Sequence, residues 1–315
     1  MSAEQMAETF RALGPADLRI MLGTELGMAS REYVPVSRIV PYANLLEEEV
    51  SKRLPELVDK RLVVSGGRRA LGYAGFRLSF LGYDCLALNA LVKRGVVEAL
   101  GSPLGLGKES DVYNARGRKG ARIVLKFHRL GRTSFRQTRR TRGYVADRSH
   151  TSWIYQARIA ATREFVALKR ARRAQVPVPR PISQNRHLIA MDLFHGSELS
   201  RTSSVPQPGD ILRRVLFQLR CVFRDAHLVH GDLSEYNILV AESGQFTLID
   251  WPQSVARTDP RAQGLLMRDV SNLVRFFAKR YGVSVPVQEA LEFVQAKKRT
   301  LSPVRQAKAG TNSVV

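Results

Sequence analysis

The sequence predicts an α+β protein in two parts, and three observations lead to that prediction. Residues 2–78 combine apolar side chains at helical spacing with two short apolar strands. Over residues 96–250, short strands alternate with amphipathic helical stretches and glycine-containing turns. With 315 residues and 44% hydrophobic content, the chain is long enough for each part to bury its own core.

The N-terminal part has the pattern of a winged-helix domain. Residues 16–28 and 41–60 each place apolar side chains on one helical face. Strands at 62–64 and 74–78 flank a connection that contains Arg68 and Arg69, candidate contacts for a nucleic-acid backbone. Residues 1–80 hold 11 Lys/Arg against 10 Asp/Glu, so a wing that docks on protein or is purely structural remains open.

A third amphipathic helix, over 80–94, is expected to connect the two parts. The next strand, at 96–100, should end at the Gly-Ser-Pro of 101–103. A glycine-containing hairpin follows, whose tip can fold over phosphates because glycine lets backbone N–H groups approach the anion. A serine stands where a third glycine would complete a G-x-G-x-x-G motif, and its hydroxyl is suited to a phosphate. The candidate ATP-binding residues of this hairpin are Gly105, Gly107, Lys108, Glu109, Ser110 and Val112.

Two charged residues in otherwise different surroundings are expected to act together. Lys126 is the one cation in the apolar strand 123–127, and it either snorkels to the surface or pairs the α- and β-phosphates of ATP. The glycine turn before it favours the phosphates. Glu164 lies in an arginine-rich helix predicted over 157–175, where it either relieves repulsion or orients Lys126 through an ion pair. We favour the ion pair.

The net charge of +22 is concentrated in one region. Residues 116–173 hold 18 Lys/Arg against two acids, whereas a solvated face normally mixes both signs. A polyanionic partner is therefore the favoured interpretation. Within this region, residues 128–157 are expected to form a flexible basic loop, in which arginines alternate with aromatic residues that suit RNA. Its candidate RNA-binding residues are Arg132, Arg136, Arg139, Arg140 and Arg142.

The clearest chemical pattern is HGDLSEYN at 230–237. Asp232 precedes Asn237 by five residues, and a strand, a turn at 242–245 and a second strand lead to Asp250. In the kinase template such residues are the catalytic aspartate and the two metal ligands, and the metal would be Mg²⁺ or Mn²⁺. A hairpin between the ligands would place both at one end of two paired strands. The alternative is an ordinary hairpin with capping aspartates.

Two further predictions complete the site. The strand at 188–194 ends before Gly196, at the position where kinases join their lobes and offer backbone groups to adenine. Met191, Asp192 and Phe194 are the candidate contacts there. Asp269, in a later helix, is expected to be a structural acceptor near the catalytic loop, below which the apolar helix 211–226 should pack.

Together these strings resemble the RIO family of atypical serine protein kinases, in its second class with an N-terminal winged helix. The strings are LGYD at 81–84, LVKRG at 91–95, GKESDVY at 107–113, HGDLSEYN at 230–237 and IDWPQ at 249–253. The short C-terminus is similar to that of archaeal members. Asp192 departs from the glutamate common in the family hinge, which leaves adenine binding unaffected because backbone atoms perform it.

The resemblance implies a reduced two-lobed kinase-like (RIO) domain after the winged helix. The expected divisions are a winged helix at 1–80, a connecting helix at 81–95, an N-lobe at 96–190, a C-lobe at 191–295 and a basic tail at 296–315. It also implies Mg-ATP binding, autophosphorylation of serine and a role in maturation of the small ribosomal subunit. Carried onto this sequence, the catalytic residues are Lys126 and Asp232, Ser110 contacts phosphate, and Asn237 and Asp250 hold metal.

Other functions are weaker but open. An aminoglycoside- or choline-kinase-like phosphotransferase also uses His-Gly-Asp-Leu with a later Asn, although it would want an acidic substrate pocket. A third hypothesis is a nucleic-acid-binding scaffold whose kinase site is vestigial. No membrane-spanning stretch or signal peptide is evident, and Cys85 and Cys221 are expected to be buried thiols. We therefore expect a cytoplasmic protein that is monomeric away from the ribosome.

Overall fold

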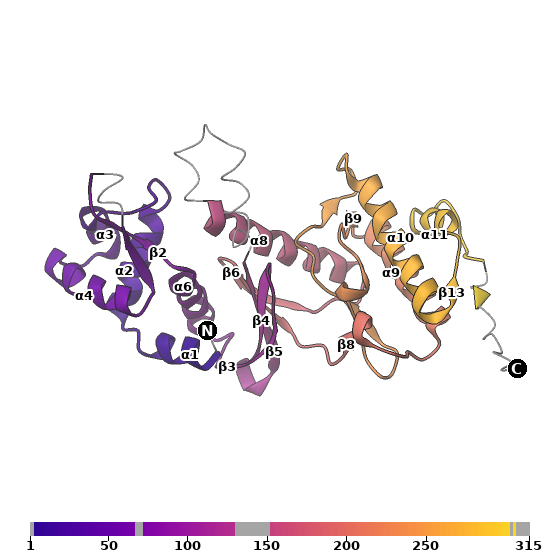
Figure 1. The fold of residues 1–315 in the computed structure, drawn as a ribbon, viewed down its shortest axis with the longest axis horizontal. Helices are drawn as coiled ribbons and strands as arrows, with labels where there is room; N and C mark the ends of the chain where they lie inside the picture. The colour runs from indigo at the N-terminus through magenta and orange to yellow at the C-terminus, as the bar shows by residue number, and fades with distance from the viewer. Residues whose placement is uncertain (1–2, 67–71, 130–151, 303–304, 307–315) are drawn as a thin grey trace, which may run out of the picture. The chain divides into compact units, whose positions relative to one another are not determined.

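The computed structural model describes residues 3–66, 72–129, 152–302 and 305–306, and it contains two compact units (Figure 1). The first unit comprises residues 1–162 and 182–191, and the second comprises residues 163–181 and 192–315. Arg68 and Arg69 lie outside the described residues, as do all five candidate RNA-binding arginines of the basic loop. Each unit is described by itself below.

Four helices and a two-stranded ribbon begin the first unit. The helices are α1 (Ala3–Arg11), α2 (Pro15–Gly27), α3 (Val36–Ala43) and α4 (Glu47–Asp59), and the antiparallel strands are β1 (Val63–Gly66) and β2 (Gly75–Leu78). The single helix expected over 41–60 is therefore two helices. Asn44 ends α3 because its backbone is left-handed, with φ of 51°. Pro55 lies inside α4 without ending it.

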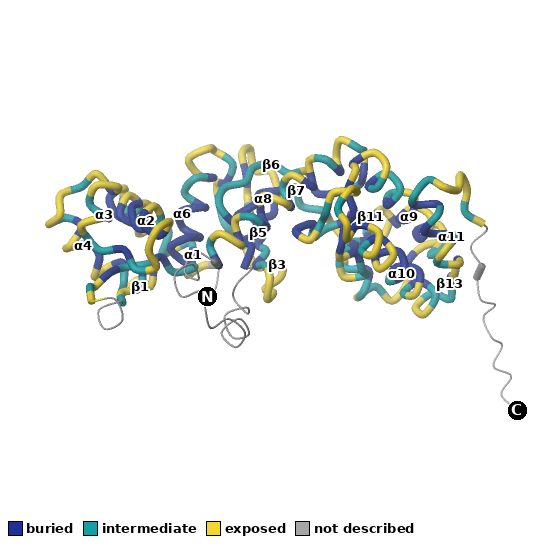
Figure 2. Tube along the Cα trace, turned by 90° about the horizontal axis from the view of Figure 1, so that it is seen from above, coloured by how far each residue is buried: buried dark blue, intermediate teal, exposed yellow. Residues whose placement is uncertain are grey.

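The helices of this first region share a continuous apolar core. Ile20, Met21, Ile39, Leu54 and Leu57 are fully buried, and they come from α2, α3 and α4 (Figure 2). The core extends into α6 (Phe80–Lys93), the connecting helix that the sequence predicts. Ser79 caps this helix, because its side chain accepts a hydrogen bond from Gly82 N at 3.0 Å.

A five-stranded sheet with the order β3-β4-β5-β7-β6 completes the first unit. Its strands are β3 (Ala99–Leu106), β4 (Ser110–Arg116), β5 (Arg122–His128), β6 (Pro181–Asn185) and β7 (Leu188–Asp192). The prediction that residues 101–103 end the first strand is wrong, because β3 continues through them with two register shifts around Pro103. Proline is tolerated there because β3 is an edge strand.

The prediction of a basic loop over 128–157 is wrong at both of its ends, and residues 130–151 lie outside the described residues. His128 belongs to β5 and Arg129, which follows it, is buried. Residues 152–157 belong to α8 (Ser152–Arg173), which begins five residues before the helix start predicted from the sequence and ends two residues before the predicted end.

The second unit is mainly helical and carries the catalytic hairpin. Its helices are the later part of α8, then α9 (Pro208–Arg224), α10 (Ala262–Tyr281) and α11 (Val287–Val294); its short strands are β8 (Ser197–Glu198), β9 (Leu228–Val229), β10 (Ile238–Val240), β11 (Phe246–Leu248), β12 (Val255–Ala256), β13 (Val283–Ser284) and β14 (Arg305–Gln306). β10 and β11 pair as the predicted hairpin, in the register Ile238↔Leu248. Val215, Leu219 and Val222 form the buried face of α9.

The described helices and the two cysteines bear on the predictions about membrane spans and thiols. Among the described helices, none is long and apolar enough to cross a membrane. Both cysteines are free thiols; Cys85 is buried as predicted, whereas Cys221 is only half-buried.

Candidate active site

The catalytic loop is fixed by a buried carboxylate on α10. Asp269 Oδ2 accepts a hydrogen bond from Gly231 N at 2.8 Å, and its Oδ1 accepts one from Leu233 N at 2.9 Å. These two N–H groups flank Asp232, so one side chain sets the backbone on both sides of the candidate catalytic residue. Asp269 is fully buried, and that burial raises its pKa to about 6, against the lowering effect of the two backbone donors. The prediction that Asp269 is a structural acceptor is confirmed.

The backbone conformation at Gly231 requires glycine at the middle position of the His-Gly-Asp sequence. Its φ is +80°, in the left-handed region that L side chains rarely adopt. A Cβ at this position would also lie 2.7 Å from the carbonyl oxygen of Gln253. Both the dihedral angle and the close approach therefore require glycine immediately before Asp232.

Asp232 projects from this fixed loop and remains accessible. Its side chain is 57% exposed, and Arg268 Nη2 lies 3.9 Å from Oδ1. Arg268 also donates a hydrogen bond to the carbonyl oxygen of Gly231. Burial raises the pKa of Asp232, the nearby charge of Asp250 raises it further, and Arg268 opposes both effects. A carboxylate with a raised pKa and a free face is suited to accept a proton from an attacking hydroxyl.

The two candidate metal ligands lie beside Asp232, at the end of the hairpin. Asn237 Nδ2 donates to the Asp232 carbonyl oxygen at 2.8 Å, which directs its amide oxygen elsewhere. Asn237 O accepts from Ile249 N at 3.0 Å, so the residue before Asp250 is tied to Asn237. Asp250 has a φ of +67°, a conformation that aspartate tolerates better than most side chains. The structure therefore brings Asp232, Asn237 and Asp250 together, as the spacing predicts.

These ligands fit a magnesium ion that is shared with phosphates. One carboxylate and one amide oxygen are hard donors of the kind that Mg²⁺ prefers, and Mg²⁺ normally completes its shell with water and phosphate oxygens. In the described part of the chain, no group of three or more His, Cys, Asp or Glu side chains could hold a metal by itself. A nucleotide would have to supply the remaining ligands.

Trp251 anchors the segment that carries Asp250. Its side chain is fully buried, and its indole N–H donates to Leu248 O at 3.1 Å. Its backbone N–H donates to Glu164 Oε1 at 3.3 Å, and the His230 ring packs on it with centroids 4.5 Å apart. Glu164 is only 1% exposed, so its carboxylate serves the metal-binding segment from α8. Its ion pair with Lys126 stays a prediction.

The candidate phosphate-binding hairpin lies in the first unit, at the turn between β3 and β4. Gly107 N donates to Ser110 O at 2.9 Å, which closes the turn, and Gly105 is exposed with open space around it. In the β4–β5 register, Val112 lies opposite Lys126 and Ser110 lies opposite His128. Directly opposite residues share a face, so these four side chains lie on one side of the sheet. Lys126 is 7% exposed, which argues against a simple surface lysine.

Arg129 holds this hairpin through its contacts with Glu109 and Asp111, a role that no local sequence pattern indicates. Its backbone N–H donates to Glu109 O at 2.7 Å, and its Nε donates to Asp111 Oδ2 at 2.6 Å. Its two terminal nitrogens bind both oxygens of Asp84, on α6, at 2.5 and 2.8 Å. His187 Nε2 lies 2.7 Å from the same Asp84 carboxylate. The cluster is buried, and it ties the connecting helix to the residues on either side of Ser110.

The candidate hinge follows β7. Asp192 N donates to Arg180 O at 3.0 Å, and its carboxylate binds the Arg180 guanidinium at 2.9 and 3.0 Å. Since its N–H is engaged, Asp192 has its carbonyl left to accept from the adenine amino group, and Phe194 remains the candidate donor. Met191 is 6% exposed, at the end of the strand. The adenine contacts themselves stay predictions.

Residues 111–290 match the RIO domain, and residues 10–94 match the N-terminal domain of Rio2. The chain is 42% identical over 257 residues to the RIO-type serine/threonine-protein kinase Rio2 of Methanocaldococcus jannaschii, covering 80% of this chain and 92% of that relative. It is 38% identical over 274 residues to the serine/threonine-protein kinase rio2 of Schizosaccharomyces pombe, covering 87% and 79%. The structure of the Rio2 kinase-ADP/Mg²⁺-phosphoaspartate complex of Chaetomium thermophilum has a TM-score of 0.79 at 32% identity and covers 93% of each chain.

Proposed function

The chain belongs to the RIO family of serine/threonine-protein kinases, with the N-terminal domain of its Rio2 group, and from that premise we propose that it uses Mg-ATP in a nucleotide-timed cycle on the precursor of the small ribosomal subunit. The observation that carries the catalytic part is the convergence of Asp232, Asn237 and Asp250 on a loop that Asp269 fixes. The relative from Chaetomium thermophilum was solved with ADP and Mg²⁺, which supports the same cofactors here.

Each residue has one task in this proposal. Gly105, Gly107 and Ser110 receive the phosphates through N–H and hydroxyl groups, and Lys126 neutralises them. Asn237, through its amide oxygen, and Asp250 hold Mg²⁺, which when bound neutralises charge on the phosphates. Asp232 orients the attacking hydroxyl or water and accepts its proton.

The region after Asp250 favours self-modification or hydrolysis over a peptide substrate. Residues 251–261 lead directly into α10, and β12 within them pairs with β9. These described residues contain no long segment on which a peptide could lie beside the γ-phosphate. We therefore infer that the phosphoryl group passes to a serine of this chain or to water.

An aspartate of the site is a third acceptor, consistent with the phosphoaspartate in the relative's complex. In that case the carboxylate oxygen bonds to the γ-phosphorus while the bond to the β-phosphate oxygen breaks and ADP leaves. Water then attacks the acyl phosphate, which returns the carboxylate and releases inorganic phosphate. The sum of the two steps is ATP hydrolysis, which would give the cycle a direction.

The ribosomal part of the proposal rests on charge. The basic region at 116–173 suits ribosomal RNA, and if phosphate contacts dominate, affinity should fall by about 0.7–0.9 log units per contact for each tenfold rise in salt. Arg68, Arg69 and the five arginines between 132 and 142 are its candidate contacts. We propose that the protein is located in the cytoplasm and is a monomer when it is not bound to the ribosome.

The test is co-sedimentation of the full chain with small-subunit precursors in ADP, in ATP and as Asp232→Ala with ATP. We expect ATP turnover to weaken binding and Asp232→Ala to keep the protein bound. Equal binding in all three samples would contradict the proposed nucleotide-timed cycle. Absence of binding in every sample would contradict the proposed role on the ribosomal precursor. Treating the ³²P-labelled protein with hydroxylamine, which cleaves acyl phosphates but not phosphoserine, separates the aspartate and serine acceptors.

A further inference from the structure

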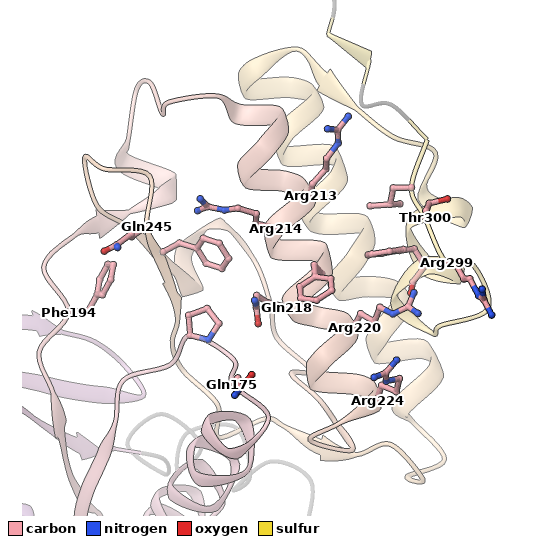
Figure 3. A pocket seen from close by; sticks show the side chains of 15 residues that line it. Gln175, Phe194, Arg213, Arg214, Gln218, Arg220, Arg224, Gln245, Arg299 and Thr300 are labelled. Atoms are coloured by element: carbon pink, nitrogen blue, oxygen red, sulfur yellow. The ribbon is translucent and has the colours of Figure 1, made fainter.

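A cavity of about 1100 Å³ lies in the second unit, between α9, the β10–β11 hairpin and the segment that follows α11 (Figure 3). Five arginines and four phenylalanines line it, and no aspartate or glutamate does. Of the proposed nucleotide-site residues, only Phe194 also lines this cavity. Apart from Phe194, the residues that line the cavity have no role in the proposed cycle, and their side chains make it cationic and aromatic.

Two of its arginines are held in place over aromatic rings. The Arg214 guanidinium lies 5.3 Å from the Phe246 ring centre, and that of Arg220 lies 5.0 Å from Phe293. Arg220 also donates to Phe293 O at 3.0 Å and to Lys298 O at 2.7 Å. Asp210 Oδ2 lies 3.7 Å from Arg214 Nη1, so both guanidinium groups are already engaged, and they form an ordered part of the cavity wall.

The cavity also contains an exposed apolar ring and a buried amide oxygen that accepts no hydrogen bond from the described residues. Phe217 is 51% exposed, so its ring offers the cavity an apolar surface that a ligand can cover. Gln218 Oε1, from the next residue of α9, is buried and has no hydrogen-bond partner among the described residues. Figure 3 places Gln218 on the face of α9 that looks toward Gln175 and Gln245. A buried acceptor of this kind requires a donor.

These features favour a peptide over a nucleic acid. Bases stack on open aromatic faces, but arginines already cover Phe246 and Phe293. A peptide backbone supplies an N–H at almost every residue for Gln218, whereas phosphate groups supply none. Carboxylates match arginine forks in geometry and charge.

We propose that this cavity is a docking site for an acidic peptide segment of a partner protein that carries an apolar side chain. The apolar side chain packs on Phe217, and a backbone N–H donates to Gln218 Oε1. Carboxylates bind the exposed Arg213 and Arg299. None of the residues given a contact with the peptide here holds the nucleotide in the proposed function, and the surface would recruit or recognise a partner.

The test uses the full chain and a fluorescein-labelled peptide that alternates glutamate with phenylalanine and leucine, followed by anisotropy. The double variant Arg213→Glu with Arg299→Glu should weaken binding by about tenfold or more, and Gln218→Met should weaken it several-fold. The matched control reverses two exposed cations of α10 outside the cavity, Arg275→Glu with Lys279→Glu, and should change affinity by less than about twofold.

Any of the following results would overturn the proposal. One is no peptide binding up to about 1 mM, or equal losses in the cavity and control variants. Another is tighter binding of labelled oligouridylate that the cavity variants alone abolish, which would make the site an RNA surface. The last is a dimer in sedimentation that the cavity variants dissociate, which would make it a contact between copies. A lysine-for-glutamate peptide serves as the charge control and should not bind.

Discussion

The guanidinium of Arg129 binds both carboxylate oxygens of Asp84, at 2.5 and 2.8 Å, inside the first unit. Burial alone would raise the pKa of Asp84, but Arg129 and His187 outweigh it and hold the pKa below its usual range. Through Asp111 and Glu109, the same arginine fixes the phosphate-binding hairpin. The connecting helix therefore contributes directly to the geometry of the nucleotide site.

Asp84→Asn should destabilise the protein by about 3–5 kcal/mol, because it leaves a buried guanidinium without half of its compensating charge. Since Arg129 would then hold Glu109 and Asp111 less firmly, KM for ATP should rise as well. Urea unfolding and steady-state ATP turnover measure the two effects. Glu56→Gln, an exposed acid on α4, is the control and should change stability by about 0.5 kcal/mol or less. Equal stability of Asp84→Asn and Glu56→Gln would contradict the prediction.

Lowering the pH should reduce ATP turnover through about pH 6. Asp269 has a pKa of about 6 because of burial, and its ionised form accepts both N–H groups that fix Asp232, whose own pKa is also raised. For stability the sign is opposite: folding raises the Asp269 pKa, so this group favours the folded state at low pH and that contribution is lost as pH rises through 6. A pH–rate profile checked against circular dichroism separates the effects. A flat profile across about pH 5–8 would contradict this assignment.

Gly231→Ala should unfold the loop around Asp232. The new Cβ would meet Gln253 O at 2.7 Å with φ held at +80°, and we expect a loss of about 2 kcal/mol or more together with lower turnover. Gly264→Ala is the matched control, because Gly264 lies in α10 with open space around it. That change should stabilise the protein by about 0.5–1 kcal/mol. Thermal unfolding of both variants tests the contrast, and a similar shift in both would exclude the steric argument.

Asp250→Asn should separate ligand chemistry from backbone conformation. Asparagine tolerates the left-handed backbone of Asp250, so stability should be preserved while Mg²⁺-dependent turnover falls by about 100-fold or more. Asp250→Ala should lose the same activity and about 1 kcal/mol of stability in addition. Turnover measured against Mg²⁺ concentration, with melting curves for both variants, gives the comparison. Retained turnover in Asp250→Asn would show that this carboxylate is not a ligand.

The candidate site could be predicted where its residues lie close together in the sequence at a characteristic spacing. The five-residue interval from Asp232 to Asn237 and the hairpin leading to Asp250 are local patterns, and the structure brings these three residues together. Arg129 could not be found in this way. It stands at the edge of a long basic run, and its partner Asp84 is 45 residues away.

Errors in the fold also have local physical causes. The helix expected over 41–60 is interrupted because Asn44 adopts a left-handed backbone, which apolar periodicity cannot reveal. Pro103 does not end its strand because the strand lies at the edge of the sheet, a fact of topology that the local sequence does not contain. Glu164 was singled out as a rare acid, but its bond to Trp251 N depends on tertiary packing.

The same edge position of Pro103 bears on whether the sheet can pair with strands of other chains. An open sheet edge offers unpaired backbone groups that recruit strands from other chains. At β3, proline removes one N–H and two register shifts distort the row. At the opposite edge, Arg94 of α6 donates to Gln184 O at 3.2 Å and Ser183 Oγ at 3.3 Å, which occupies part of β6. Both edges of the five-stranded sheet are thus protected against pairing with strands of other chains.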